Sequence, residues 1–309
     1  MGIGSPKPSA DFFTSLSRAR SVALRLCGSR DAGVADAEHW KSRMTWAIGA
    51  CNILGAYAAM ISDVQITCRD GRTADLVRKA YPVGPYIVGA FAGSVYIGFE
   101  LLQSISDYLR LPADAPPNSA WEPNVVAEHW APIARDVFEA APKDQQDLGA
   151  QFLLVGPHPT EDGIPTRAIP YLCKFSSPAF EPEITRNGNS AISIGSGAVV
   201  TQYRDGISEV LDPKSGLLQA EMGPPGGWAR SLGFAVNRLL TWHPVSGISQ
   251  HIHIHVAHRG EFHFQNSDMK EYPKDSPVRE IRMPPVAESY EQLLKMAECL
   301  DSDAATAVC

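Results

Sequence analysis

Apolar residues first gather into two short runs, at 45–50 and 56–61, each of a length typical of a β-strand. Between them lies Asn52-Ile53-Leu54-Gly55, which can form a tight turn, so the pair predicts a β-hairpin. A third run, at 86–91, is followed by a Gly-Ser pair and then by apolar residues at helical spacing as far as Leu109. This pattern predicts a strand, a tight turn and a helix.

The rest of the chain continues this alternation, with segments rich in Pro, Gly or Asn between the apolar patterns. Further helices are predicted at 125–140, where Pro132 would kink or restart the helix, at 199–211, at 228–242 and, with an amphipathic pattern, near 286–300. Further strands are predicted at 152–155, 171–175, 191–194 and 249–257, the first three joined by connections that look long for hairpins. Strand groups alternating with helix pairs predict an α+β fold, a four-layer αββα sandwich.

Composition and charge narrow the range of partners. The 309 residues include 27 basic and 34 acidic side chains, a net charge of -7, so no basic surface for nucleic acid or an anionic membrane is indicated. The six cysteines contain no C-x-x-C pair, which argues against a zinc site or a disulfide framework and favours a reducing cytoplasm. No apolar stretch reaches the ~20 residues of a spanning helix. We therefore expect a cytoplasmic protein whose partners are proteins or peptides.

Short motifs with chemical potential follow one another between residues 44 and 260. They are Met44-Thr45-Trp46-Ala47-Ile48-Gly49, Ile61-Ser62-Asp63-Val64-Gln65, Arg78-Lys79, Ala92-Gly93, Ile194-Gly195-Ser196-Gly197 and Val245-Ser246-Gly247. In this order they resemble the motifs of the proteasome β subunits and the HslV-type peptidases, which are N-terminal-nucleophile hydrolases. The resemblance implies a threonine protease, without cofactor or metal, that cleaves peptides or unfolded proteins in a homo-oligomeric ring, with an ATPase unfoldase as a possible partner.

The resemblance assigns one catalytic residue to each motif: Thr45, Asp63, Lys79, Gly93, Ser196 and Ser246. A Thr hydroxyl is a poor nucleophile until a base takes its proton, and a free α-amino group, with a pKa near ~8, is suited to that task. Thr45 supplies both groups only when it is the first residue.

The remaining roles are electrostatic. A buried ammonium at Lys79 would favour loss of the hydroxyl proton, and the carboxylate of Asp63 would keep that lysine charged and oriented. The backbone N–H of Gly93 would face the developing oxyanion, a type of donor whose loss typically costs about 3 kcal/mol. Ser196 and Ser246 would hold the terminal amine and its water.

By the same resemblance, Phe91 would line the pocket for the substrate side chain, and its bulk implies a shallow pocket. The chain also departs from the family pattern. It has Met44 where processed subunits have Gly, and His243 where the family often has Asp. Two extra residues ahead of Asp63 fall in the turn at 52–55.

Met44 suggests how Thr45 becomes the first residue. Translation starting at Met44, with removal of that Met, would achieve it; the rival hypothesis is a genuine leader or propeptide of residues 1–44. The expected domains are this leader, a hydrolase domain at 45–265 and a C-terminal extension at 266–309 with an amphipathic helix.

Each proposed site residue also has a structural explanation, because Thr favours strand starts, Asp, Gly and Ser favour turns, and Lys79 could be a solvated charge. Two other classes of function therefore stay open. One is a non-catalytic structural subunit of the same ring fold, which the mature N-terminus distinguishes. The other is a small-molecule amidase of the same superfamily, which native mass distinguishes.

The run His251-Ile252-His253-Ile254-His255 is the other unusual feature. In a strand the three imidazoles share one face, where two of them are spaced to bind zinc or nickel. No carboxylate or thiol lies at a comparable spacing. We therefore predict no metal here, and a polar sheet face or a subunit contact instead.

Overall fold

The computed structural model describes residues 45–52, 57–67, 72–110, 114, 121–158, 169–186, 190–212, 214, 227–257, 262–265, 270–271, 279–280 and 282–297. All of these belong to one unit, Trp40–Cys309. The expected leader at 1–44 lies outside the described residues, as do parts of the C-terminal extension.

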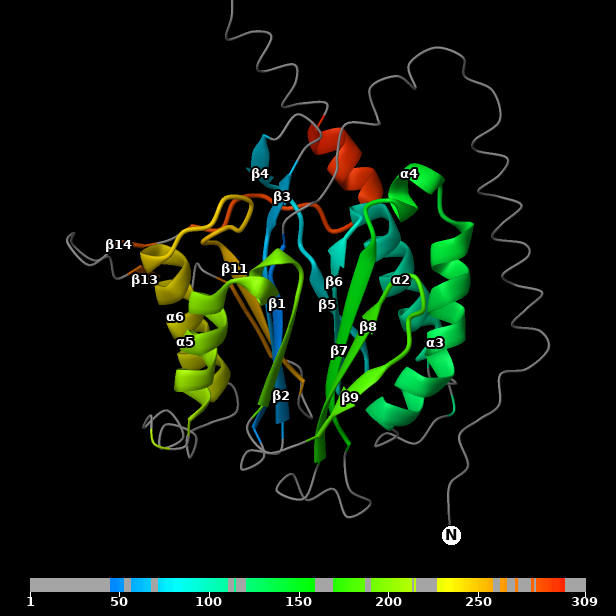
Figure 1. Ribbon diagram of the computed structural model, residues 1–309, viewed down its shortest axis with the longest axis horizontal. Helices are drawn as coiled ribbons and strands as arrows, with labels where there is room; N and C mark the ends of the chain where they lie inside the picture. The colour runs from blue at the N-terminus through cyan, green and yellow to red at the C-terminus, as the bar shows by residue number, and fades with distance from the viewer. Residues whose placement is uncertain are drawn as a thin grey trace, which may run out of the picture. The chain divides into compact units, whose positions relative to one another are not determined.

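Two five-stranded antiparallel sheets form the centre of this unit (Figure 1). The first has the order β10-β1-β2-β11-β12, with bounds Ser190–Ile194, Ala47–Asn52, Tyr57–Asp63, Ile252–Ala257 and Phe262–Gln265. The second has the order β5-β6-β7-β8-β9, with bounds Ala80–Gly84, Ile87–Gly93, Ala150–His158, Ile169–Ser176 and Glu183–Thr185. Two short pairs lie outside them: β3 (Gln65–Thr67) with β4 (Thr73–Asp75), and β13 (Lys270–Glu271) with β14 (Arg279–Glu280).

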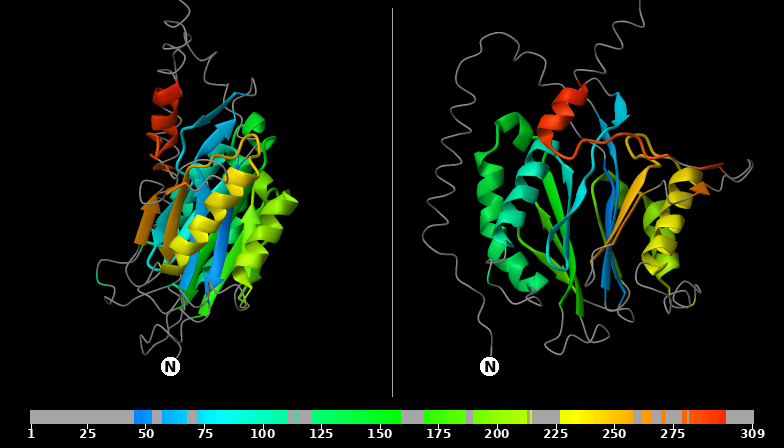
Figure 2. Two further views of the ribbon diagram at one scale, coloured as in Figure 1. Left: turned by 90° about the vertical axis from the view of Figure 1, so that its left-hand side faces the viewer. Right: turned by 180° about the vertical axis from the view of Figure 1, so that it is seen from behind.

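Helices cover the outer face of each sheet (Figure 2). Helices α2 (Val95–Tyr108) and α3 (Pro123–Ala140) pack on the second sheet, followed by the short α4 (Lys143–Gln146). Helices α5 (Thr201–Leu211) and α6 (Gly227–Trp242) pack on the first sheet, and the 3-10 turn η3 (Ser196–Val199) precedes them. The layers therefore run helices, sheet, sheet, helices, while the assignment of this arrangement to the N-terminal-nucleophile class stays a prediction.

Strand alternation explains why the sequence shows continuous apolar runs. On β1, Ile48 and Ala50 face α5 and α6, whereas Ala47 and Cys51 face the second sheet. Both faces are buried, so no polar alternation develops. Gly49 lies on the inner face, where an added Cβ would come within 2.6 Å of the Val155 side chain, so the absence of a side chain lets the sheets approach.

The local predictions agree with most of these elements. The hairpin β1–β2, the unit β6–turn–α2 and the helices α3, α5 and α6 are confirmed. A restart of the helix predicted at 125–140 at Pro132 is wrong, because α3 runs through that residue. The long connection expected at 156–170 is also wrong in its extent, since β7 reaches His158, β8 starts at Ile169 and the two strands pair directly.

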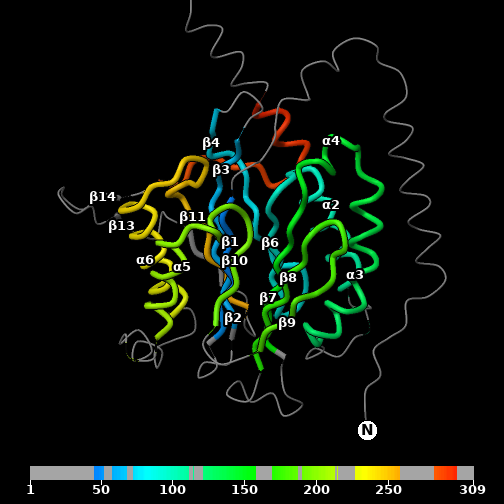
Figure 3. Tube along the Cα trace, in the orientation of Figure 1, coloured from blue at the N-terminus to red at the C-terminus, as the bar shows by residue number. Residues whose placement is uncertain are grey.

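The C-terminal extension packs onto the same core as the strands. A helix at 290–297 buries Leu293 in the core that α2 and β6 also line, within the amphipathic helix expected at 286–300. Ahead of it, Ala287 forms a parallel bridge to Val77, with its N–H donating to the Leu76 carbonyl at 2.6 Å. Figure 3 shows the described end of this segment in red.

Trp130 anchors α3 on the second sheet, so its truncation should destabilise the fold. The indole is fully buried, 5.0 Å from the ring centroid of Phe152 and 5.2 Å from that of Phe175. We expect Trp130→Ala to lower the free energy of unfolding by about 3–5 kcal/mol, measured by chemical denaturation. Trp130→Phe should cost less, because it keeps the ring contacts and loses mainly the N–H bond to Ser104 Oγ. Equal losses for the two variants would contradict this account.

Candidate active site

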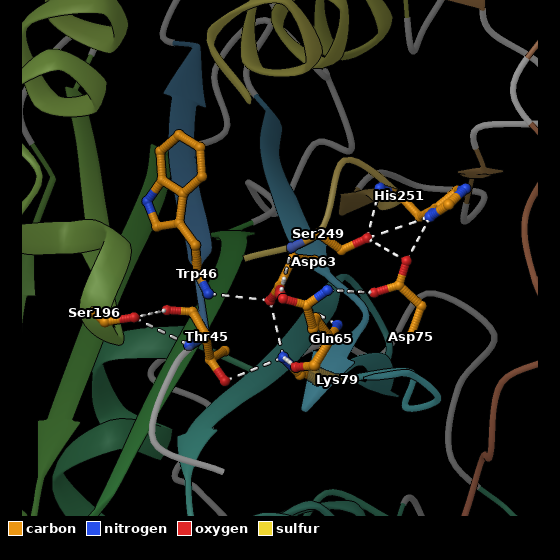
Figure 4. A network of polar contacts seen from close by, with 9 residues as sticks. All are labelled: Thr45, Trp46, Asp63, Gln65, Asp75, Lys79, Ser196, Ser249 and His251. Carbon is orange, nitrogen blue, oxygen red and sulfur yellow. Dashed lines mark hydrogen bonds and ion pairs between the residues drawn. The ribbon is translucent and has the colours of Figure 1, made fainter. Parts of the chain in front are cut away.

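The two sheets bring Thr45 and Lys79 together, although the residues are 34 positions apart (Figure 4). Thr45 lies just ahead of β1 in the first sheet, and Lys79 lies just ahead of β5 in the second. The Nζ of Lys79 donates to Thr45 Oγ1 at 3.1 Å. Lys79 is 0% exposed and Thr45 is 2% exposed, so this contact is shielded from bulk water.

Asp63, the last residue of β2, forms a buried ion pair with Lys79 at 2.9 Å. Its Oδ1 also accepts from the N–H of Trp46 at 3.0 Å, and its Oδ2 accepts from the N–H groups of Gln65 at 3.2 Å and Ser249 at 3.3 Å. These four partners are all donors, and a proton on the carboxyl group would face one of them. The arrangement therefore favours the ionised carboxylate, and with it a charged Lys79.

The surroundings of Lys79 supply three acceptors for its three N–H bonds. They are Thr45 Oγ1, Asp63 Oδ1 and the carbonyl oxygen of Gln65. Burial lowers the pKa of Lys79 below its ordinary value and raises that of Asp63, while their mutual attraction opposes both shifts. A lysine with a lowered pKa is closer to exchanging a proton near neutral pH than an exposed lysine.

The turn between β10 and η3 holds the backbone of Thr45. The N–H of Thr45 donates to Ser196 Oγ at 3.2 Å, and the Ser196 hydroxyl donates to the Thr45 carbonyl at 3.3 Å. Gly195, with φ of 81°, turns the chain here, and its N–H donates to Gln151 Oε1 at 2.7 Å. Since Gln151 belongs to β7, this bond links the turn to the second sheet.

A pocket of about 340 Å³ opens beside Thr45 and Ser196. Gly93, at the end of β6, is one of the lining residues and has a φ of 94°. An added Cβ at Gly93 would lie 2.4 Å from the Gly149 carbonyl oxygen, so this position has no room for a side chain. All the residues that line the pocket are uncharged, and several are glycine or serine. Thr45 itself lines the pocket, so a molecule bound there would lie against this residue.

Two predicted site residues lie elsewhere. The side chain of Phe91 is buried between β6 and α2, where it packs 5.3 Å from the Phe99 ring, and it does not line this pocket. Ser246 is exposed, and within the described residues no hydrogen bond joins it to Thr45. Ser249, three residues later and buried, reaches the carboxylate of Asp63 instead.

The sequence reasoning missed a second polar group next to Asp63. Asp75 accepts from Ser249 Oγ and from His251 Nδ1, each at 2.7 Å. No local sequence motif predicts the group of Asp75, Ser249 and His251, because its members come from β4 and from the segment ahead of β11. The only signal was the histidine run itself.

The histidine run does not form an exposed face. His251 lies ahead of β11, while His253 and His255 are 2% and 0% exposed. They pair with Ser62 and Met60 of β2 on the face that packs against the second sheet. The expectation of a subunit contact for His253 and His255 is therefore wrong, because this face is covered within the chain.

Within the ranges that the structure describes, no cluster of three or more His, Cys, Asp or Glu side chains is placed to hold a metal ion. The helices in these ranges include none with both the length and the apolar character needed to cross a membrane. A scan against protein-family models and a search of curated proteins find no match to this chain.

Proposed function

We propose that this chain is a threonine-dependent peptidase of the proteasome and HslV type, built on the αββα N-terminal-nucleophile fold. The observation that carries the proposal is the contact of Thr45 Oγ1 with the buried Lys79–Asp63 ion pair. A buried lysine that donates to a hydroxyl stabilises negative charge on that oxygen. A lysine that only carried a solvated surface charge would not be fully buried, as Lys79 is.

In the first half of the reaction, Thr45 acts as the first residue of the mature chain. Its amine, at the place of the present nitrogen 3.2 Å from Ser196 Oγ, takes the proton of Oγ1. Oγ1 attacks the peptide carbonyl while Lys79 stabilises its developing charge and the N–H of Gly93 binds the oxyanion. The carbon–nitrogen bond breaks, the leaving amine receives the proton, and an ester to Thr45 forms.

In the second half, the same amine takes a proton from water, which attacks the ester. The ester bond breaks, the acid product leaves and the Thr45 hydroxyl regains its proton. The uncharged pocket beside Thr45 would bind a part of the substrate peptide next to the bond that is cleaved. The motif resemblance alone supports a homo-oligomeric ring and an ATPase unfoldase as partner, and the scattered cysteines support the cytoplasm as compartment.

The mature N-terminus of protein purified from its own cell tests the proposal. We expect N-terminal sequencing and intact mass to show a chain that begins at Thr45, and an electrophilic peptide probe to add its mass to that residue. Thr45→Ala should abolish peptide hydrolysis and labelling, and Thr45→Ser should keep part of both, because it retains a hydroxyl beside the amine.

Thr201→Ala, at an exposed position at the start of α5, is the matched control and should retain full activity. Active protein that begins at Met1 throughout would refute the mechanism. A ring without hydrolysis or labelling would indicate a structural subunit, and a small oligomer that cleaves only small amides would indicate an amidase.

A further inference from the structure

Asp75 connects the two backbone donors that bind Asp63 Oδ2. One donor is the N–H of Ser249, and the Ser249 hydroxyl donates to Asp75 Oδ2 at 2.7 Å. The other is the N–H of Gln65, whose side-chain amide donates to Asp75 Oδ1 at 2.9 Å. The two residues whose N–H groups bind Asp63 Oδ2 therefore each donate a side-chain hydrogen bond to one oxygen of the Asp75 carboxylate (Figure 4).

Gln65, which donates to Asp75, also contacts Lys79 through its backbone carbonyl. Gln65 and Asp75 are register partners across the short β3–β4 ladder, so the side-chain bond reinforces a fixed backbone position. The carbonyl of Gln65 accepts from Lys79 Nζ. Movement of Gln65 would therefore disturb both partners of the ion pair that touches Thr45.

His251 completes the arrangement. Its Nδ1 lies 2.7 Å from Asp75 Oδ2, and its backbone N–H donates to Ser249 Oγ at 2.9 Å. Because an ionised carboxylate only accepts, the Ser249 hydroxyl donates its proton to Asp75 Oδ2. The His251 and Asp75 side chains are 27% and 22% exposed, so this group links the closed site to the surface.

The charge of Asp75 is maintained by its partners. Although burial acts to raise the pKa of Asp75, hydrogen bonds from His251, Ser249 and Gln65 hold it below its ordinary value. The carboxylate also acts to raise the pKa of Lys79. It thereby favours the same charged form of the lysine as Asp63 does.

We propose that Asp75 and His251 are positioning residues for the reaction at Thr45: through Ser249 and Gln65 they fix the carboxylate of Asp63, and through it the ammonium of Lys79. The inference rests on the proposed function. Neither residue touches Thr45, so their loss should leave substrate binding unchanged and lower the rate of the chemical step.

The test is steady-state peptide hydrolysis by the full, processed protein. We expect Asp75→Ala and His251→Ala to lower kcat about tenfold or more with KM unchanged, by analogy with the loss of outer partners at other preorganised sites. His251→Asn should recover much of the loss, because the Asn amide nitrogen takes the place of Nδ1 and can donate to Asp75. A merely structural role would show no such rescue.

A double-mutant cycle checks the connection between the two residues. Adding His251→Ala to Asp75→Ala should cost little more, since both act through one path. Exposed residues of α3, Asp136 and His129, supply the controls Asp136→Ala and His129→Ala, which should retain full kcat. If Asp75→Ala does not fold, the variants His251→Ala and His251→Asn, at a partly exposed position, are sufficient to test the positioning role.

Full kcat in both single variants, additive losses or a failed Asn rescue would overturn the positioning role while leaving the proposed function intact. An unaltered protein that neither hydrolyses peptides nor takes the probe at Thr45 would overturn the proposed function, and this inference with it.

Discussion

Replacing Lys79 with Ala should lower the rate of peptide hydrolysis by at least about 10³-fold, because it removes the buried ammonium that donates to Thr45 Oγ1. We expect Asp63→Asn to lower the rate of peptide hydrolysis by a similar factor. The carboxylate accepts four hydrogen bonds, and an amide nitrogen in place of one oxygen would face donors that it cannot accept. Turnover of a fluorogenic peptide, together with labelling of Thr45, measures both losses.

These variants also leave one buried charge without its partner, which typically destabilises a protein by about 3–5 kcal/mol. Their unfolding and native mass must therefore be measured beside activity. Lys143→Ala is the matched control, since Lys143 forms an exposed pair with Asp147 and its loss should change neither stability nor turnover appreciably. A folded Lys79→Ala protein with near-normal turnover would show that Lys79 is not part of the chemistry.

Gly195→Ala should inactivate the site through the backbone of Thr45. An added Cβ would lie 2.1 Å from the Thr45 carbonyl oxygen and 2.8 Å from its carbon, so the strand start must move. With φ of 81° and ψ of -173°, Gly195 is in a region that only glycine adopts readily, and a side chain there adds about 1–3 kcal/mol of strain. Displacing a reacting group by about 1 Å can cost about 100-fold in rate, and we expect kcat/KM to fall by at least that factor.

Gly149→Ala separates the effect of the clash with Thr45 from the effect of a side chain at a positive φ. Gly149 also lines the pocket with positive φ, 68°, but its added Cβ would meet only Ser177 Oγ, at an ordinary 3.5 Å. This variant also places a side chain at a positive φ but lacks the clash, so its loss of activity should be much smaller. Equal losses in the two variants would mean that strain, and not displacement of Thr45, disables the site.

Local sequence determined most of the secondary structure. Apolar runs and breakers located β1, β2, β6 and the main helices, because strand and helix periods are set by neighbouring residues. β5 was missed since Pro82 interrupts its pattern, and β5 is an edge strand of its sheet, where proline is tolerated. β9 was missed because three residues are too few to show a period.

The order of motifs was enough to nominate Thr45, Asp63, Lys79 and Ser196, and the fold brings these four side chains together. Their contact could not be read from spacing, because it joins one sheet to the other. It depends on how the two sheets align when they pack, which no local pattern encodes.

The direction of inward-facing side chains was decided only by tertiary structure. When both faces of a strand are buried, alternation shows which residues share a face but not what covers that face. Phe91 therefore proved to face the helices, and His253 and His255 the second sheet. Asp75 and His251 meet because separate segments converge beside Asp63, and such long-range contacts exist only once the chain has folded.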